Sequence, residues 1–290
     1  MIWSNDPAAA QYNPPAPVIC EYCGAERYHK GINLFGRVLW PPHGAERCTC
    51  PEAVAAYEQE KAEREAREAA EKAAAEAERM RKRIQRIVGD SGMGERFLRR
   101  NFATFEVTEE NRAAQRAAKS YADNFDALLP HPGAPEPGKN GLFIAGPKGT
   151  GKTHLAAAIA NQLMHGDPPT AVICMTMIDL LERIRRTFGK GGVDEADVLT
   201  TYKTVPLLII DDMGKEPATE WAVSTVYNII NGRYEAYLPT IITTNYDTQA
   251  LIQRMTPSTT GDPTTAEATI DRLMEMCRGI VMDGQSWRSR

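Results

Sequence analysis

The sequence lacks any hydrophobic run long enough to cross a membrane, since no stretch approaches the roughly 20 apolar residues that a transmembrane helix needs. Its first residues, MIWSNDPAAAQYNPP, also lack the basic segment and following apolar run of an export signal. Both absences argue against a membrane or secreted protein, so we expect a cytoplasmic location, where thiols stay reduced. The six cysteines are then better candidates for metal binding than for disulfides.

An excess of positive charge is missing as well. The formal net charge is −4, so the whole molecule has no basic field to gather nucleic acid, and any DNA contact has to come from a local patch. The 290 residues, of which 42% are hydrophobic, are enough for one domain of about 200 residues and a smaller part.

The composition changes twice along the chain and predicts three parts. Residues 1–51 form an N-terminal module with a polar, Pro-rich start that predicts disorder. Residues 52–90 form a charged helical linker, because Ala, Glu, Lys and Arg dominate and Gly and Pro are missing up to residue 88. Large apolar residues are scattered there, which favours a solvated spacer helix over a coiled coil. Residues 91–290 alternate short apolar runs with longer helical stretches, which predicts an α/β domain with a parallel sheet.

The N-terminal module carries two cysteine pairs with metal-ligand spacing: Cys20, Cys23, Cys48 and Cys50. Residues 18–51 are too few to fold on an apolar core alone, so a metal staple explains how they become ordered. We expect Zn²⁺ held by the four cysteines. In the main variant of this site, His29 or His43 replaces one cysteine. The alternative is a reduced, partly disordered arm.

A phosphate-binding pattern follows the first clear core strand. Residues 141–145 read as that strand, and GPKGTGKT comes directly after it. The predicted nucleotide-binding residues are those of this P-loop and the next residue in the helix: Gly146, Pro147, Lys148, Gly149, Thr150, Gly151, Lys152, Thr153 and His154. The glycines let backbone N–H groups curl around phosphate oxygens, and the helix N-terminus adds a favourable dipole. Lys152 supplies a positive charge to the outer phosphates, and Thr153 offers a hydroxyl to Mg²⁺.

Two further apolar runs end in polar residues. Residues 205–210 are followed by Asp211, expected to hold Mg²⁺, and Asp212, expected to orient the attacking water. Because Asp is one methylene shorter than the Glu that is commoner at the second position, we expect slow hydrolysis. Residues 239–244 are followed by Asn245, a candidate sensor of the terminal phosphate. The alternatives are capping or turn roles for all three side chains.

Four stretches in this order carry a family resemblance: GPKGTGKTHLAAAIA, LLIIDDMGKE, TEWAVSTVYNIINGRYE and PTIITTNYD. They resemble the DnaC/DnaI-type replicative helicase loaders, which share their core with the IstB-type transposition helper ATPases. The resemblance covers residues 95–290. It implies an AAA+ P-loop NTPase domain that binds ATP with Mg²⁺, and it implies that residues 95–105 pack beside the adenine.

The same resemblance assigns two arginines. Residues 268–273 match the segment that presents an arginine finger, so Arg272 is expected to reach into a neighbour's ATP site. Such a contact requires self-association into a ring or spiral. Residues 286–290 match the closing motif of the family, which makes Arg288 the candidate sensor-2 arginine of its own subunit.

Single-stranded DNA is the substrate that the resemblance implies. Residues 177–188 gather a basic and aromatic set: Arg183, Arg185, Arg186 and Phe188. Basic groups beside an aromatic ring can hold a single strand without reading its sequence. An amphipathic helix with a solvated basic face is an equally weighted alternative.

A cysteine-bearing module before the ATPase core resembles the DnaI-type arrangement, in which the N-terminal part grips the replicative helicase. We therefore expect an ATP-dependent loader of a DnaB-type hexameric helicase onto single-stranded DNA, with ATP binding for assembly and hydrolysis for release. One alternative is an IstB-like transposition helper ATPase, and another is a nucleotide-gated adaptor without turnover. The cysteine module favours the loader, because it suggests a dedicated protein partner.

Overall fold

The computed structural model describes residues 2–34, 37–88, 95–131, 138–188, 194–284 and 286–287. The chain divides into two compact units, Met1–Ala75 and Glu76–Arg290, and each is described by itself. The three-part division at residues 51 and 90 stays a prediction. Within the described residues, no helix is long and apolar enough to span a membrane.

The first unit contains small antiparallel sheets. A three-stranded sheet has the order β1-β4-β5, and β2 pairs with β3: β1 (Ile2–Trp3), β2 (Val18–Ile19), β3 (Glu26–Arg27), β4 (Lys30–Leu34) and β5 (Arg37–Leu39). The short helix η1 (Pro7–Tyr12) completes the unit's fold. The prediction that the N-terminal start is disordered is therefore wrong for residues 2–12. Burial explains the order, because Ala9 is fully buried and the Trp40 indole N–H donates to the Tyr12 carbonyl at 3.0 Å.

Helix α1 (Pro51–Val88) forms where the charged linker was expected. Its Pro51 stands at the first helical position, where the missing N–H costs no hydrogen bond. All side chains from Glu58 to Arg79 are exposed, and i,i+4 pairs such as Arg67–Glu71 at 3.1 Å lie along the helix. These features agree with a solvated helix.

The second unit is built on a five-stranded, fully parallel sheet in the order β10-β6-β9-β8-β7. Its strands are β6 (Gly141–Ala145), β7 (Val172–Thr176), β8 (Leu207–Met213), β9 (Thr240–Thr244) and β10 (Cys277–Val281). Strand β9 lies between β6 and β8. The carboxyl ends of these three strands therefore meet at one edge, where the P-loop, the two aspartates and Asn245 follow them.

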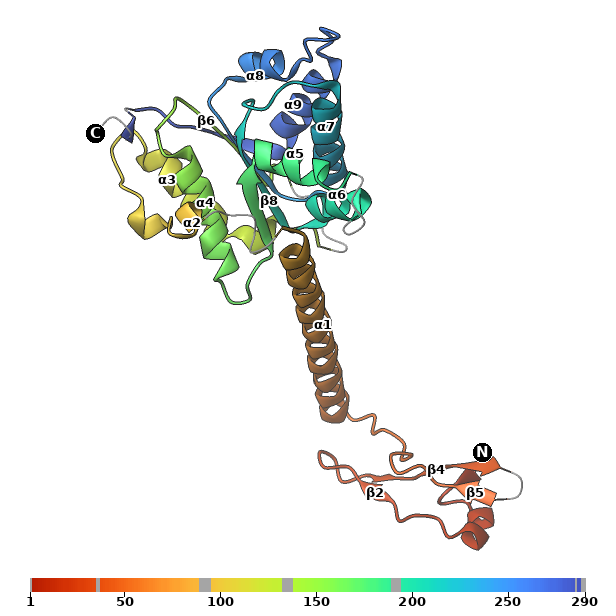
Figure 1. Cartoon of the computed structure of the whole chain (residues 1–290). Coiled ribbons are helices and arrows are strands. Elements are labelled where there is room, and N and C mark those ends of the chain that lie inside the picture. Colours follow the sequence, from red (N-terminus) through yellow and green to blue (C-terminus); the bar gives the residue numbers. More distant parts are fainter. Residues whose placement is uncertain are drawn as a thin grey trace. The chain divides into compact units, whose positions relative to one another are not determined.

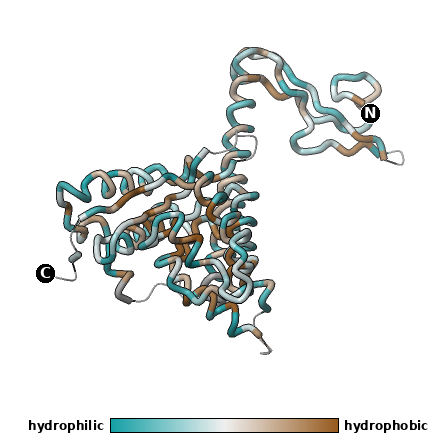
Figure 2. The backbone as a smooth tube through the Cα atoms, turned by 90° about the horizontal axis from the view of Figure 1, so that it is seen from above, coloured by the Kyte–Doolittle hydropathy of each residue, from teal (hydrophilic) through white to brown (hydrophobic). Residues whose placement is uncertain are grey.

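Helices cover both faces of this sheet, as Figure 1 shows. On one face lie α2 (Glu95–Leu98), α3 (Arg112–Asp123) and α4 (Lys152–Met164), with the short helices η2 (Phe102–Thr104) and η3 (Phe125–Leu128). On the other lie α5 (Met177–Arg185), α6 (Glu195–Thr204), α7 (Glu220–Glu235), α8 (Thr248–Met255) and α9 (Thr264–Met276). Successive strand residues alternate between the two cores, so Leu142 packs with the first set and Phe143 with the second. The hydrophobic stretches accordingly gather inside this unit in Figure 2.

Candidate functional site

The P-loop connects β6 to α4 in a conformation that needs glycine. Gly149 and Gly151 have φ angles of +85° and +100°, a region that side-chain-bearing residues rarely adopt. Gly151 is the residue before the first turn of α4, so the amino end of a 13-residue helix opens toward the loop. This is the local arrangement that binds phosphate.

Lys152 lies at the centre of the site and is 5% exposed. Its ammonium donates to the carbonyl oxygens of Gly146 and Pro147, both at 2.7 Å, and to Asn245 Oδ1 at 2.9 Å. The structure thus brings together the P-loop lysine and the asparagine at the end of β9, as the strand order required. The acceptors in these three bonds are neutral oxygens.

Thr153 and Asp211 meet on the other side of this lysine. The Thr153 hydroxyl donates to Asp211 Oδ1 and Oδ2 at 2.9 and 3.0 Å, and the Thr243 hydroxyl donates to Oδ1 at 2.5 Å. Burial raises the pKa of the Asp211 carboxyl, while the hydrogen bonds from Thr243 and Thr153 oppose that rise. Adjacent hydroxyl and carboxylate oxygens are the hard ligands that Mg²⁺ prefers, so these residues fit the ion.

Asp212 sits on a bulge of β8. The pairing of β8 with β9 shifts register between Ile210 and Met213, and Asp212 has a φ of +59°. Its N–H donates to Thr243 Oγ1 at 3.0 Å, and its carboxylate forms an ion pair with Lys215 at 2.5 Å. Bulges often re-aim a side chain next to a functional site, and here the Asp212 side chain lines the nucleotide cleft.

A cleft of about 340 Å³ opens above these residues, a volume within the range of small-molecule sites. It is lined by Arg100, Thr104, Phe105, Glu106, Lys148, Gly149, Gly151, Lys152, Thr153, His154, Asp212, Lys215, Asn245 and Trp287. Four of these side chains are cationic and two are carboxylates, which gives the cleft a positive excess suited to a polyphosphate. Arg272 does not appear among the described residues of this lining.

One wall of the cleft comes from the segment before α3, as expected for residues 95–105. His154 Nε2 lies 3.1 Å from the Asn101 carbonyl oxygen, and its ring meets Phe105 edge-on with 5.2 Å between centroids. Burial lowers the pKa of His154. The amide of Asn161, on α4, also donates to the carbonyls of Phe97 and Arg100, which fixes this segment beside the P-loop.

Trp287 also lines the cleft, a contact that the sequence analysis did not predict. The Trp287 N–H donates to the Gly149 carbonyl at 3.1 Å, and a Cβ on Gly149 would lie 2.0 Å from Ser286 Oγ. Ser286 and Trp287 therefore pack directly on the P-loop. Arg288, the candidate sensor-2 arginine, follows this contact but lies outside the described residues.

Arg272 is held within its own chain. Its Nε donates to Asn231 Oδ1 at 2.6 Å, and its guanidinium lies 4.9 Å from the Tyr227 ring centroid. It also donates to the Ala268 carbonyl at 3.1 Å. The side chain is half-buried between α9 and α7, so a contact with a neighbour's nucleotide would have to replace these partners.

Two of the four predicted DNA-binding residues, Arg185 and Phe188, contact Trp221, an aromatic side chain that the sequence analysis missed. Arg185 lies over the Trp221 ring at 4.7 Å, and Phe188 meets the same ring edge-on at 5.8 Å. Arg186 pairs with Glu182 at 3.0 Å, whereas Arg183 is half-buried. Trp221 is 33 residues away from Phe188 along the chain, and no local pattern links the two.

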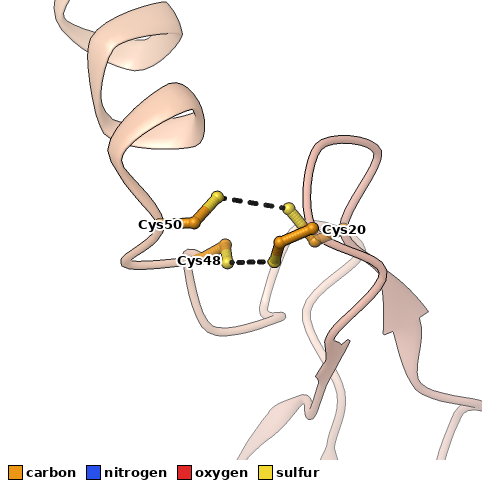
Figure 3. A group of neighbouring side chains, drawn as sticks. Cys20, Cys48 and Cys50 are labelled. Carbon is orange, nitrogen blue, oxygen red and sulfur yellow. Dashed lines mark hydrogen bonds between the residues drawn. The ribbon is translucent and has the colours of Figure 1, made fainter.

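The four cysteines of the first unit form one cluster, and Figure 3 shows the side chains of Cys20, Cys48 and Cys50 pointing toward one another. All four sulfurs lie within 4.8 Å of one another, with Cys20–Cys50 at 3.9 Å and Cys23–Cys48 at 3.4 Å. Tetrahedral ligands at about 2.3 Å from a zinc ion are about 3.8 Å apart, so the set fits Zn²⁺.

The donors themselves favour the four-cysteine form of this site. Among the described residues, the cluster contains no histidine, so neither His29 nor His43 replaces a cysteine here. Backbone hydrogen bonds from Cys23 and Tyr22 lower the pKa of the Cys20 thiol to about 6. Despite a backbone hydrogen bond from Ala53, burial and the neighbouring thiols raise the pKa of the Cys50 thiol to about 12. Without a metal, Cys20 is therefore the more readily ionised of these two thiols. A thiolate is the form that binds a metal.

Comparison with known proteins finds similarity to an ATP-binding family and to replicative helicase loaders. A family model described as IstB-like ATP binding protein matches residues 137–290. The replicative helicase loader DnaC of Escherichia coli strain K12 is 26% identical over 220 residues, which cover 75% of this chain and 81% of that protein. The replicative helicase loader DnaC of Buchnera aphidicola subsp. Schizaphis graminum is 28% identical over 168 residues, covering 57% of this chain and 63% of that protein. The chain thus spans less than two thirds of that Buchnera relative's length.

Two solved structures share the fold of the second unit. The crystal structure of DnaI has a TM-score of 0.52 and 26% identity, covering 67% of this chain and 93% of that chain. The crystal structure of the DnaC helicase loader has the same TM-score and identity, covering 66% of this chain and 100% of that chain. The parallel five-stranded sheet with its P-loop is therefore an AAA+ type of α/β fold.

Proposed function

Because the chain belongs to the family of IstB-like ATP binding proteins, we propose that it is an ATPase that loads a DnaB-type replicative helicase onto single-stranded DNA. The observation that carries the nucleotide part is the convergence of Lys152, Thr153, Asp211, Asp212 and Asn245 at one edge of the sheet. The printed names of the DnaC and DnaI relatives support the loader part.

Each of these residues has a chemical task with ATP in the cleft. Lys152 exchanges its carbonyl partners for the outer phosphate oxygens, and Thr153 and Asp211 hold Mg²⁺. A Mg²⁺ ion bound there would supply charge neutralisation at the phosphates. Asp212 orients the attacking water, and Asn245 hydrogen-bonds near the terminal phosphate. The short reach of Asp212 makes turnover slow.

Arg272 acts in a neighbouring subunit's site. Self-association breaks its bond to Asn231 and its stacking on Tyr227, and it gains charge stabilisation at the transferring phosphoryl group. Because these intrachain contacts have to be given up, the subunits assemble firmly only when ATP supplies the compensating charge. ATP binding then favours assembly, and hydrolysis favours release of the helicase.

In this proposal, the first unit binds the helicase. Zn²⁺ held by the four cysteines would join the β2–β3 hairpin to the start of α1. One face of the three-stranded sheet then presents a cross-strand pair, Ile32 opposite Leu39, with Leu34 and Trp3 on the same face. All four side chains are exposed, and such a set marks a protein-binding surface.

Single-stranded DNA binds the exposed residues around Trp221. Arg185 and Arg186 neutralise phosphates, and the rings of Phe188 and Trp221 offer stacking surfaces. Arg183 lies on the same helix and adds to the local positive charge.

Steady-state ATP hydrolysis tests the proposal, measured with and without single-stranded DNA and a DnaB-type helicase. Lys152→Ala should weaken ATP binding about 10- to 100-fold, because a charge-assisted contact is lost. Arg272→Ala should keep ATP binding and lose turnover. Lys203→Ala is the control, because this half-buried lysine on α6 bonds Asn228 and does not line the cleft, and it should behave as the wild type.

The outcomes separate the candidate functions. Turnover that requires both residues and changes with the helicase supports the loader. Turnover that is independent of Arg272 and of the helicase contradicts it and favours the transposition helper. ATP binding without turnover under any of these conditions favours the adaptor.

A further inference from the structure

Lys215, which the sequence did not single out, contacts Asp212 inside the nucleotide cleft. Its ammonium lies 2.5 Å from Asp212 Oδ2, and both side chains line the cleft. The pair is partly exposed, at 35% for Lys215 and 27% for Asp212. A carboxylate that orients a water has to accept a hydrogen bond from it, and an ammonium on the same carboxylate competes for that role.

The loop that carries Lys215 is fixed in place. Gly214 has a φ of +91°, and its N–H donates to Glu216 Oε2 at 2.9 Å. Its carbonyl accepts from Arg254 Nε at 3.3 Å, and a Cβ on Gly214 would lie 2.6 Å from Leu251 Cδ1. Since Glu216 is 8% exposed, the loop is anchored by a buried carboxylate and by α8. The backbone on either side of Lys215 therefore has little freedom.

Asp212 is fixed at its backbone too. Its N–H is bonded to Thr243 Oγ1, and that hydroxyl in turn bonds Asp211. An aspartate has only two side-chain torsions, so with its backbone held the direction of the carboxylate depends mainly on its partners. In this structure the partner of Oδ2 is Lys215.

We propose that Lys215 is a positioning residue that restrains hydrolysis by holding Asp212 in an ion pair. Asp212 becomes effective when the pair opens, so the closed pair adds to the short aspartate as a cause of the slow turnover that we expect. The proposal rests on the proposed ATPase function. Because exposed ion pairs are weak, the restraint is small, and its removal raises kcat about two- to fivefold.

Three variants test the role of Lys215. Lys215→Met keeps the length of the side chain without its charge, and it should raise kcat about two- to fivefold with KM within about twofold of the wild type. Lys215→Arg keeps a cation beside Asp212 and should keep the low kcat. In an Asp212→Asn background, Lys215→Met should have no effect on residual turnover, because Lys215 acts through Asp212.

A matched control is available on α3. Lys119 forms an i,i+4 pair with Asp123 at 3.1 Å and does not line the cleft, so Lys119→Ala should leave kcat unchanged. A fall in kcat for Lys215→Met, an unchanged kcat, or an equal effect in the Asp212→Asn background overturns the proposal.

The same assay separates this proposal from the proposed function. Wild-type turnover above the Lys152→Ala background, with Lys215→Met unchanged, overturns the restraint alone. If neither the wild type nor Lys215→Met exceeds that background, both the restraint and the ATPase activity are wrong.

Discussion

The side chain of Trp221, at the start of α7, is contacted by a cation and by a second aromatic ring. The Arg185 guanidinium lies over it, and Phe188 packs edge-on against it. Cation–π and aromatic contacts of this kind fix ring orientation, which lowers the entropic cost of stacking a base. Three residues from two helix ends therefore behave as one candidate surface for a single strand.

Replacing Trp221 by Ala should weaken binding of single-stranded DNA about 5- to 100-fold, the loss expected for one stacked base. Arg185→Ala and Arg186→Ala should each reduce the slope of log K against log salt by about 1, because each removes one phosphate contact. Fluorescence anisotropy with a labelled oligonucleotide at several salt concentrations measures both effects. Arg116→Ala, an exposed arginine on α3, is the charge control. Unchanged affinity in all three site variants would place the DNA elsewhere.

At the scale of elements, one buried arginine joins three pieces of the second unit. Arg233 on α7 is fully buried, and it donates to the carbonyls of Tyr202, Val205 and Pro239 at 2.8, 2.8 and 2.6 Å and to Thr240 Oγ1 at 2.9 Å. These bonds connect α7 with the end of α6 and the start of β9. Burial lowers the pKa of Arg233 to about 9, so the guanidinium stays protonated at pH 7.

Arg233→Ala should lower the free energy of unfolding by about 3–5 kcal/mol, because it leaves buried carbonyls unsatisfied and opens a cavity. Thermal unfolding of the full chain measures the loss, with Arg116→Ala as the exposed control. The folded-state pKa of about 9 lies below the ordinary value of 12.5, so the wild-type arginine is protonated in both states at neutral pH. The difference between variant and wild type should therefore stay constant from pH 6 to pH 7. A loss close to that of the control would contradict the role of Arg233 in connecting α7 with α6 and β9.

The sequence predicts well what depends on local order. The P-loop, the apolar runs before Asp211 and Asn245, and the charged helix all appear where residue type and spacing placed them. It predicts poorly what depends on side chains meeting across the fold. Trp221 and Trp287 carry no local signal, because their partners Arg185, Phe188 and Gly149 are distant along the chain. Lys215 is only three residues from Asp212, but their contact depends on the bulge of β8, which the sequence does not reveal.

One error and one untested assignment show the same limit of sequence analysis. The Pro-rich start was expected to be disordered, yet Trp40 and the small sheet order it through contacts that composition does not reveal. Arg272 was assigned by resemblance to a contact between subunits. Only the fold shows that its side chain contacts Asn231 and Tyr227 of its own chain in this structure. The finger role itself stays a prediction.

At the scale of the whole molecule, the two units have separate chemistry. Every described residue that lines the nucleotide cleft belongs to Glu76–Arg290, whereas the cysteine cluster belongs to Met1–Ala75. The second unit has its own sheet and two hydrophobic cores, while the first has few buried side chains and needs a staple. Loss of a metal from the cysteine cluster should therefore affect partner binding without affecting ATP binding or hydrolysis.

The double variant Cys20→Ser, Cys23→Ser should lose one bound Zn²⁺ per chain, since two of four ligands are removed. We expect the full-length variant to fail to retain a DnaB-type helicase in a pull-down, while its ATP hydrolysis without helicase stays within about twofold of the wild type. Metal analysis of the purified protein and the two assays together give the readout. Cys277→Ala is the control, because Cys277 is buried in β10 and should leave metal content and helicase binding unchanged. A variant that lost the metal and still retained the helicase would show that helicase binding does not depend on the first unit. The exposed face of Ile32 and Leu39 would then lose its proposed role.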